Sequence, residues 1–187
     1  MFKENQIFCF MDYETTGIDT SSGTKVRPIQ ICCIYTDVWL NELYSFQELI
    51  KWSELMNWDR WPLHAHNAYN VHRIPLKKVQ KKGKWPHEIV IKLIKIDKKI
   101  RKNLTNKYKP VIISDAPNFE MFFTEMIFGS RQKPEFPFHY NAWSVNPVVK
   151  LLDVKMGEKP HDALSDAMLM LEGMREVYQK LNLKESK

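Results

Sequence analysis

Three consecutive short runs rich in apolar and aromatic residues, in the first part of the chain, constrain its fold more than any other feature. They cover residues 7–11, 29–35 and 40–46, and each is short and bounded by polar or turn-forming residues. Short apolar runs of this kind are typical of β-strands rather than helices. Asp37 marks the turn between the second run and the third. The sequence therefore predicts an antiparallel three-stranded meander.

The rest of the chain mixes helical and strand-like patterns. Apolar residues at helical spacing over 89–100 predict a helix that packs on the sheet, and Val111–Ser114 is a short strand-like run. A helix is predicted from Asn118, an irregular section broken by prolines from 134 to 147, and a last helix over 164–178. This order predicts an α/β fold in which helices flank a sheet.

Two carboxylates lie at the end of the first apolar run. Asp12 and Glu14 are two residues apart, so their side chains face the same way on a strand, and Gly17 lets the chain turn away after them. Mg²⁺ and Mn²⁺ take oxygen ligands, and enzymes that act on phosphates hold such ions between carboxylates. The pair predicts half of a metal site, although the surface acids of a solvated strand end would have the same spacing.

A second polar group precedes the last predicted helix. Pro160 disfavours helical geometry in the residue before it, and Asp162 or Ser165 suits a first helical turn. On one helix, His161 and Asp166 would point ~140° apart, given ~3.6 residues per turn. We therefore expect His161 in the loop before the helix and Asp166 in its early turns, over one cleft. A capping or packing role for the histidine is the alternative.

These motifs resemble those of the DEDDh 3′-to-5′ exonucleases, the ribonuclease H-like group that includes proofreading subunits, ribonuclease T and oligoribonuclease. Residues 12–17 are similar to the first motif, D-x-E-T-T-G, and residues 161–166 to the third, H-x-A-x-x-D. Residues 71–74 look like the V-H-x-I segment of the family. The resemblance implies a ribonuclease H-like fold, with a central mixed sheet in which an antiparallel three-stranded meander is followed by parallel strands.

The same resemblance implies a metal-dependent hydrolase. Two ions, Mg²⁺ or Mn²⁺, would be held by Asp12, Glu14, Asp166 and a carboxylate of the second motif, with Asp12 bridging them. His161, neutral near pH 7, would be the general base that takes a proton from the attacking water. The implied reaction removes nucleoside 5′-monophosphates from the 3′ end of a single strand.

The second motif departs from the family pattern. The family has a Phe-Asp pair in the first turn of the helix after a strand, and this chain has Phe119 and Glu120 in that register. We expect Glu120, one methylene longer than aspartate, to be the ligand. Asp115, at the end of the strand, is the rival, and the sequence leaves the choice open.

Contacts with a single-stranded 3′ end are also implied by the resemblance. The residues concerned follow or flank the motifs; they are Thr15, Thr16, Gly17, His72, Ile74 and Phe119. The formal net charge of +6 agrees with a nucleic-acid partner, either DNA or RNA. Lysines gather in two clusters, one over residues 77–84, directly after the V-H-x-I segment, and one over residues 92–109. A solvated helix face is the alternative for such a cluster.

Composition indicates one globular enzyme domain over residues 1–187. The chain is 44% hydrophobic and 12% aromatic, and no segment resembles a long disordered linker. Cys9, Cys32 and Cys33 fall in apolar runs without C-x-x-C spacing, so we expect reduced core residues. No signal segment or membrane-spanning run is recognisable, which predicts a soluble cytoplasmic protein without a membrane partner. The sequence permits a homodimer but marks no surface for one.

Two other classes of function stay open. A degenerate nuclease domain would bind single strands or a partner protein without cutting, and the Glu120 departure is its support. A structural or regulatory module would use its lysines on an acidic partner, which makes both motifs coincidental. Metal-dependent cleavage separates an active nuclease from both alternatives.

Overall fold

The structure is a computed structural model that describes residues 5–20, 25–53, 63–104 and 108–182. Within these residues a five-stranded sheet has the order β3-β2-β1-β4-β5. The strands are β1 (Phe8–Thr15), β2 (Pro28–Thr36), β3 (Glu42–Leu49), β4 (Val111–Ser114) and β5 (Ala142–Ser144). Strands β1, β2 and β3 pair antiparallel, and β4 and β5 continue the sheet in parallel with β1. The predicted mixed sheet, an antiparallel meander followed by parallel strands, is confirmed.

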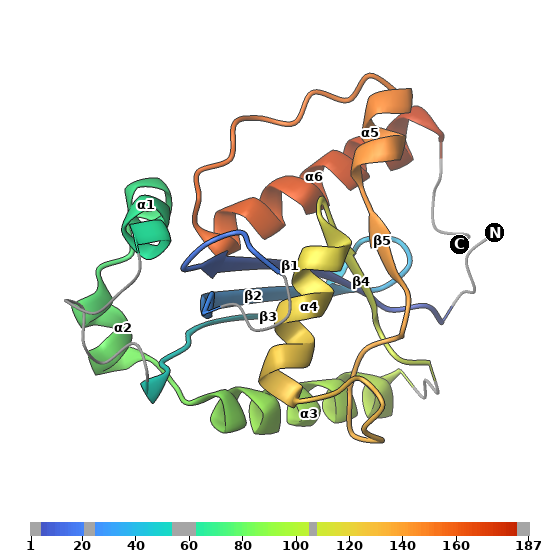
Figure 1. The fold of residues 1–187 in the computed structure, drawn as a ribbon. Helices are drawn as coiled ribbons and strands as arrows, with labels where there is room; N and C mark the ends of the chain where they lie inside the picture. The colour runs from blue at the N-terminus through green and yellow to red at the C-terminus, as the bar shows by residue number, and fades with distance from the viewer. Residues whose placement is uncertain (1–4, 21–24, 54–62, 105–107, 183–187) are drawn as a thin grey trace.

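Helices cover both faces of the sheet (Figure 1). The described helices are α1 (Leu63–His72), α2 (Leu76–Lys82), α3 (Pro86–Asn103), α4 (Pro117–Phe128), α5 (Asn146–Leu151) and α6 (Ala163–Lys180). Helices α3 and α4 bury their apolar residues against one face, together with Cys9, Met11 and Tyr13 of β1. Helices α5 and α6 pack on the other face, against Phe8 and Phe10. Alternate residues of β1 therefore enter two separate cores, as the period of a strand requires.

The central strand β1 is longer than the apolar run that predicts it. Its pairing with β2 continues through Asp12 and Glu14 to Thr15, whereas its pairing with β4 spans only residues 8–10. Asp12 and Glu14 thus lie within the strand, not after it. Because β4 ends at Ser114, no strand of the described residues pairs with the second half of β1 on that side. The carboxyl ends of two parallel strands meet here, which is where α/β sheets commonly bind ligands.

Two other sequence predictions need correction. The third strand starts at Glu42 rather than Leu40, because the Asp37 carboxylate accepts hydrogen bonds from the backbone of Trp39 and Asn41 and extends the turn. The section from 134 to 147 is not wholly irregular, since it contains β5 and the start of α5. An edge strand of three residues is too short to show a period of two. Helices α1 and α2 were not predicted.

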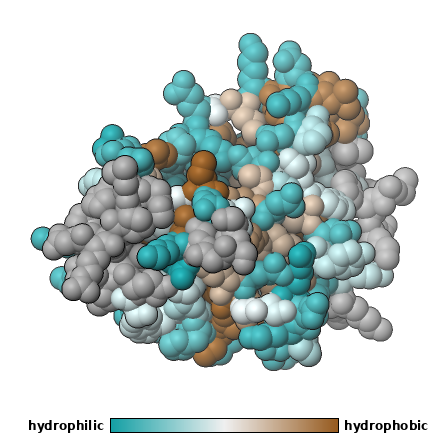
Figure 2. Space-filling model, viewed as in Figure 1, coloured by the Kyte–Doolittle hydropathy of each residue, from teal (hydrophilic) through white to brown (hydrophobic). Residues whose placement is uncertain are grey.

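The surface agrees with this core arrangement. On the face shown in Figure 2, hydrophilic side chains predominate and hydrophobic ones form separate small patches. Cys9, Cys32 and Cys33 are free and buried, as predicted. None of the described helices combines the length and the apolar character that crossing a membrane requires.

Candidate active site

Strand β1 supplies the two carboxylates at the centre of the site. Asp12 and Glu14 point to the α6 face of the sheet, where they are 5% and 8% exposed. Their backbone is fixed by the ladder with Cys32 and Gln30 of β2. Both side chains are therefore held on rigid backbone and largely shielded from bulk water.

Helix α6 brings Asp166 to the same place. Its N-cap is Asp162, whose carboxylate accepts a hydrogen bond from the backbone N–H of Ser165 at 3.3 Å. The fully buried Ala163 and Ala167 let the helix lie close to the sheet, and Asp166 is 2% exposed. His161 lies in the loop before the helix with a φ of 57°. The predicted placement of His161 in a loop and Asp166 in the early turns agrees with this geometry.

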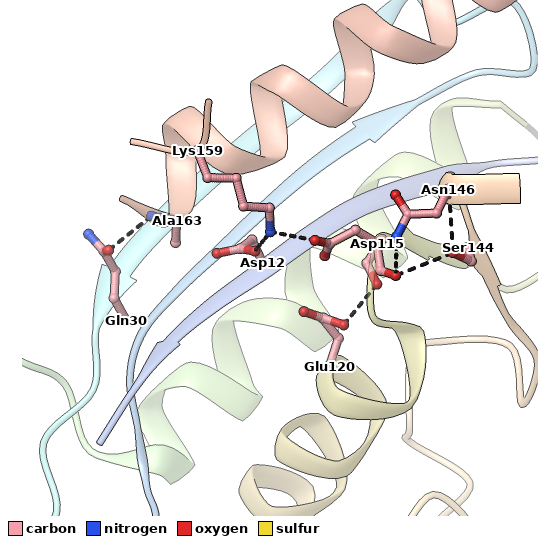
Figure 3. A network of polar contacts seen from close by, with 9 residues as sticks. Asp12, Gln30, Asp115, Glu120, Ser144, Asn146, Lys159 and Ala163 are labelled. Atoms are coloured by element: carbon pink, nitrogen blue, oxygen red, sulfur yellow. Dashed lines mark hydrogen bonds and ion pairs between the residues drawn. The ribbon is translucent and has the colours of Figure 1, made fainter. Parts of the chain in front are cut away.

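Strand β4 and helix α4 supply the remaining carboxylates. Glu120, in the first turn of α4, is 2% exposed and accepts a hydrogen bond of 2.8 Å from the Ser114 hydroxyl. Asp115 lies in the turn between β4 and α4. Its backbone carbonyl accepts hydrogen bonds from Asn146 at 3.0 Å and Ser144 at 3.3 Å, which fixes the turn (Figure 3).

The five carboxylates form two groups that share Asp12. Oxygens of Asp12, Glu14 and Asp166 lie within 4.8 Å of one another, and so do oxygens of Asp12, Asp115 and Glu120. Within the described part of the chain, the Asp166 Oδ1 atom is buried without a hydrogen-bond partner. An all-oxygen set with an unpaired buried acceptor fits hard divalent cations such as Mg²⁺ or Mn²⁺.

Electrostatics strengthen the case for a cation here. Burial raises the pKa of Glu120 to about 8, although the Ser114 hydrogen bond opposes the shift. Burial, with the charges of Asp166 and Asp162, raises the pKa of Glu14 to about 7. The pKa of Asp12 is raised well above its usual range, mainly by burial and also by the neighbouring carboxylates. Carboxylates gathered in this way need a positive charge to ionise together.

Lys159 supplies one such charge, and sequence analysis missed it. Its Nζ lies 2.6 Å from Asp115 Oδ2 and 3.9 Å from Asp12 Oδ1 (Figure 3). Burial alone lowers the pKa of Lys159, but the contact with Asp115 and the charge of Asp12 outweigh this effect and raise it. The only signal in the sequence was its place two residues before His161, and a single lysine there is easily taken for a solvated side chain.

A pocket of about 360 Å³ opens onto this cluster. It is lined by the five carboxylates, Lys159 and His161, together with Tyr13, Thr15, Gly17, Ile18, Ala68, Val71, His72, Ala116 and Phe119. Of the predicted substrate contacts, Thr15, Gly17, His72 and Phe119 thus border the pocket. Thr16 and Ile74 do not line it. Thr16 is buried and hydrogen bonds to the backbone of Arg27, and Ile74 packs in a small apolar cluster.

The exonuclease family model of the ribonuclease T type matches residues 9–173. The chain belongs to this family. The match spans most of the chain and includes all five carboxylates and His161. Membership of this exonuclease family makes the chain a nuclease-type domain. Its acidic cluster is compatible with metal binding.

Solved exonuclease I structures share the fold of this ribonuclease T family member. A zinc-bound complex of E. coli exonuclease I with single-stranded DNA has a TM-score of 0.68 at 17% identity, over 96% of this chain and 42% of that chain. The enzyme from Methylocaldum szegediense has a TM-score of 0.70 at 15% identity, over 95% and 41%. This chain thus spans 41% to 42% of those chains. None of the curated proteins matches it.

Proposed function

We propose that this exonuclease-family domain hydrolyses the terminal phosphodiester bond of single-stranded nucleic acid from the 3′ end and releases nucleoside 5′-monophosphates. The observation that carries the proposal is the convergence of five carboxylates in two groups that share Asp12, beside His161, at one pocket. Two ligand groups that share one carboxylate are the arrangement that two-metal phosphoryl chemistry uses.

The proposed roles follow the two groups of carboxylates. Asp12, Glu14 and Asp166 would hold one Mg²⁺ or Mn²⁺ ion, and Asp12 and Glu120 the other, with Asp115 as a further ligand. Bound ions would supply Lewis acidity and lower the pKa of a water molecule. His161 is exposed at the pocket and would accept the proton of the attacking water at an imidazole nitrogen.

The rim of the pocket suits the end of a single strand. Ile18 is 87% exposed and Val71 51% exposed, and both border the pocket with Phe119. Exposed apolar side chains beside a polar cleft give bases a surface to stack on or pack against. E. coli exonuclease I has been solved in complex with single-stranded DNA and with a dT13 oligonucleotide, which supports a single-stranded substrate for the shared fold.

His72 is suited to donate a hydrogen bond to that end. Its Nδ1 accepts the backbone N–H of Ile74 at 2.9 Å, so a neutral ring carries its proton on Nε2. Burial and the charge of His161 lower the pKa of His72 to about 4, which keeps the ring neutral at pH 7. Ile74 would thus act on the substrate only indirectly, through the backbone N–H that orients the His72 ring. Thr16 would act indirectly, because its hydrogen bonds with Arg27 hold the turn after Glu14.

The first lysine cluster is better placed for phosphates than the second. Lys77, Lys78, Lys81, Lys82 and Lys84 are all exposed, on and just after helix α2. Helix α2 directly follows α1, which contributes Ala68, Val71 and His72 to the pocket. The second cluster lies mainly on α3, and its Lys107 is outside the described residues. Lys92 there is already paired with Glu48 at 2.6 Å.

A cleavage assay on matched single strands tests the proposal. DNA and RNA oligonucleotides labelled at the 5′ or the 3′ end are incubated with Mg²⁺, with Mn²⁺ or with chelator, and the products are sized over time. A ladder that shortens from the 3′ end, only with metal, is the expected result. The Asp12→Ala variant should lose cleavage entirely, and His161→Ala should lose about 10²-fold in turnover with the fold intact.

Three results would contradict the proposal. Shortening from the 5′ end would reverse the direction, and a His161→Ala variant with normal turnover would remove the general base. Binding without cleavage by the wild-type domain would favour a degenerate nuclease module. The comparison of DNA with RNA in the same assay identifies the preferred sugar.

A further inference from the structure

The shortest ion pair of Lys159 is with a carboxylate that belongs to only one of the two groups. Its ammonium contacts Asp115 at 2.6 Å and lies 3.9 Å from the shared Asp12. The group of Asp12, Asp115 and Glu120 therefore already has a cation at its edge, supplied by the chain itself. In the group of Asp12, Glu14 and Asp166, the described ion pair with this ammonium is the longer one, to the shared Asp12, and Figure 3 draws the lysine with its two partners. The charge of Lys159 also opposes the rise that burial causes in the pKa of Glu14 and Asp166.

A divalent ion and this ammonium would compete for the same oxygens. Like charges a few ångströms apart in a partly buried site repel strongly, and the two cations would share Asp12 and Asp115 as counter-charges. An ion in the Asp12, Asp115 and Glu120 group therefore binds well only if the Lys159 ammonium moves away.

The Lys159 side chain is long and partly exposed, so its ammonium can change position. It comes from the loop that precedes α6, between the exposed residues Glu158 and Pro160, and its side chain is 32% exposed. Four rotatable methylene carbons let its ammonium reach the pocket opening, where a phosphate could take the place of the carboxylates as its partner.

We propose that Lys159 is a positioning residue that makes the two metal positions unequal. Without metal it holds Asp12 and Asp115 together, and it weakens ion binding to the Asp12, Asp115 and Glu120 group until its ammonium leaves. The ion at the Asp12, Glu14 and Asp166 group consequently binds first. This inference rests on the proposed function only in requiring that the carboxylates bind divalent ions.

Calorimetric titration with Mn²⁺ alone, in the absence of nucleic acid, tests the inference. Lys159→Met keeps the aliphatic stem and removes the charge, and Lys159→Gln is a second neutral variant in case the first does not fold. In both, the weaker of two Mn²⁺ binding events should tighten by at least about tenfold. Lys159→Arg and Lys155→Met, which removes an exposed lysine in the same loop, should match the wild type.

Thermal unfolding gives a readout that does not depend on activity. In chelator, Lys159→Met should unfold at a lower temperature than wild type, because Asp12 and Asp115 lose their counter-charge. Saturating Mn²⁺ should remove this difference. Lys155→Met should unfold like the wild type in both conditions.

The outcomes separate this inference from the proposed function. If the wild type binds Mn²⁺ and cleaves, but the neutral variants have the same isotherm or bind more weakly, the role of Lys159 is refuted and the nuclease is not. If the wild type binds no Mn²⁺, the proposed function fails, and the inference fails with it.

Discussion

Glu120 shows how one residue joins the carboxylate cluster while departing from the family pattern. It is one methylene longer than the aspartate expected in that register, yet its oxygens reach Asp12 and Asp115. The Ser114 hydroxyl, on the last residue of β4, donates to Glu120 Oε2 and fixes the longer side chain. A buried carboxylate oriented by a neighbouring donor is the usual environment of a metal ligand.

The two rivals of the second motif can be separated by charge removal. Glu120→Gln should lower turnover by about 10²-fold or more. Mutating a residue that only hydrogen bonds to a metal ligand typically lowers activity by about 10–100-fold, and loss of the ligand itself should lower it further. Asp115→Asn should lower turnover by less than about 10-fold, since Asp115 is less buried and already pairs with Lys159. Steady-state kinetics measures the turnover of both variants. A larger loss of turnover in Asp115→Asn than in Glu120→Gln would assign the ligand role to Asp115.

Most residues of the site could be predicted from the sequence, because carboxylate spacing and the family motifs report chemistry directly. Asp12, Glu14, Asp166 and His161 were chosen on that basis, and the structure brings them to one pocket. Lys159 could not be predicted in this way. A lysine acquires a role through its partners in space, and Asp12 and Asp115 lie far from it in the sequence.

At the level of elements, two side chains, Asp162 and Gln30, hydrogen bond the start of α6 to the sheet. Besides capping the helix, the Asp162 carboxylate accepts hydrogen bonds from Gln30 of β2 at 3.2 Å and Gln47 of β3 at 3.3 Å. Gln30 in turn accepts the backbone N–H of Ala163. The helix start, with His161 before it and Asp166 after it, is thereby fixed relative to the strands.

Removing this cap should disturb both stability and activity. Asp162→Ala should lower the free energy of unfolding by about 1–2 kcal/mol, the usual cost of a lost helix N-cap. Turnover should fall as well, because His161 and Asp166 lose their common anchor. Urea denaturation and the cleavage assay measure the two effects. Asp162→Asn keeps an N-cap oxygen and should unfold near wild type; an equally unstable Asn variant would show that the cap is not the cause.

Helices and strands could be predicted where the periodic pattern of apolar residues was long. Prediction failed where that pattern was short. Helices α3 and α6 repeat apolar residues over many turns, and their burial decides their orientation. Strand β1 continues beyond its apolar run because β2 pairs with it, and a residue such as Asp12 carries no local sign of that pairing. Tertiary context overrides propensity in such segments.

At the scale of the whole molecule, a chain with a net charge of +6 concentrates buried carboxylates at one point. In the metal-free fold the pKa of Glu14 rises from 4.5 to about 7 and that of Glu120 from 4.5 to about 8, in each case chiefly through burial. Between pH 4.5 and about 8 the folded protein therefore binds more protons on Glu14 and Glu120 than the unfolded chain does. Its stability therefore decreases as the pH rises through this window.

Thermal unfolding in chelator should reveal this dependence. The stability that comes from protonated Glu14 and Glu120 is fully present below pH 4.5 and is lost as the pH passes about 7 and then about 8. The melting temperature should fall by on the order of 5 °C between pH 5 and 8. Saturating Mn²⁺ should reverse the trend, because metal favours the ionised carboxylates. A melting temperature that rises with pH in chelator would contradict the raised pKa values.

The architecture as a whole was predictable because it depends mainly on the order of the strands and helices along the chain. The order of strands and helices, with the meander first, was enough to indicate the mixed sheet. The lengths and registers were not, since pairing between distant segments decides where each strand ends.

Strand β1 lies at the centre of the sheet, but its carboxylates are completed by residues from the β4–α4 turn and from α6, far later in the chain. During synthesis, Asp12 and Glu14 leave the ribosome long before Asp166 does. In a nascent chain the group of Asp12, Asp115 and Glu120 can therefore assemble first, whereas the group of Asp12, Glu14 and Asp166 is complete only after α6 has emerged and docked.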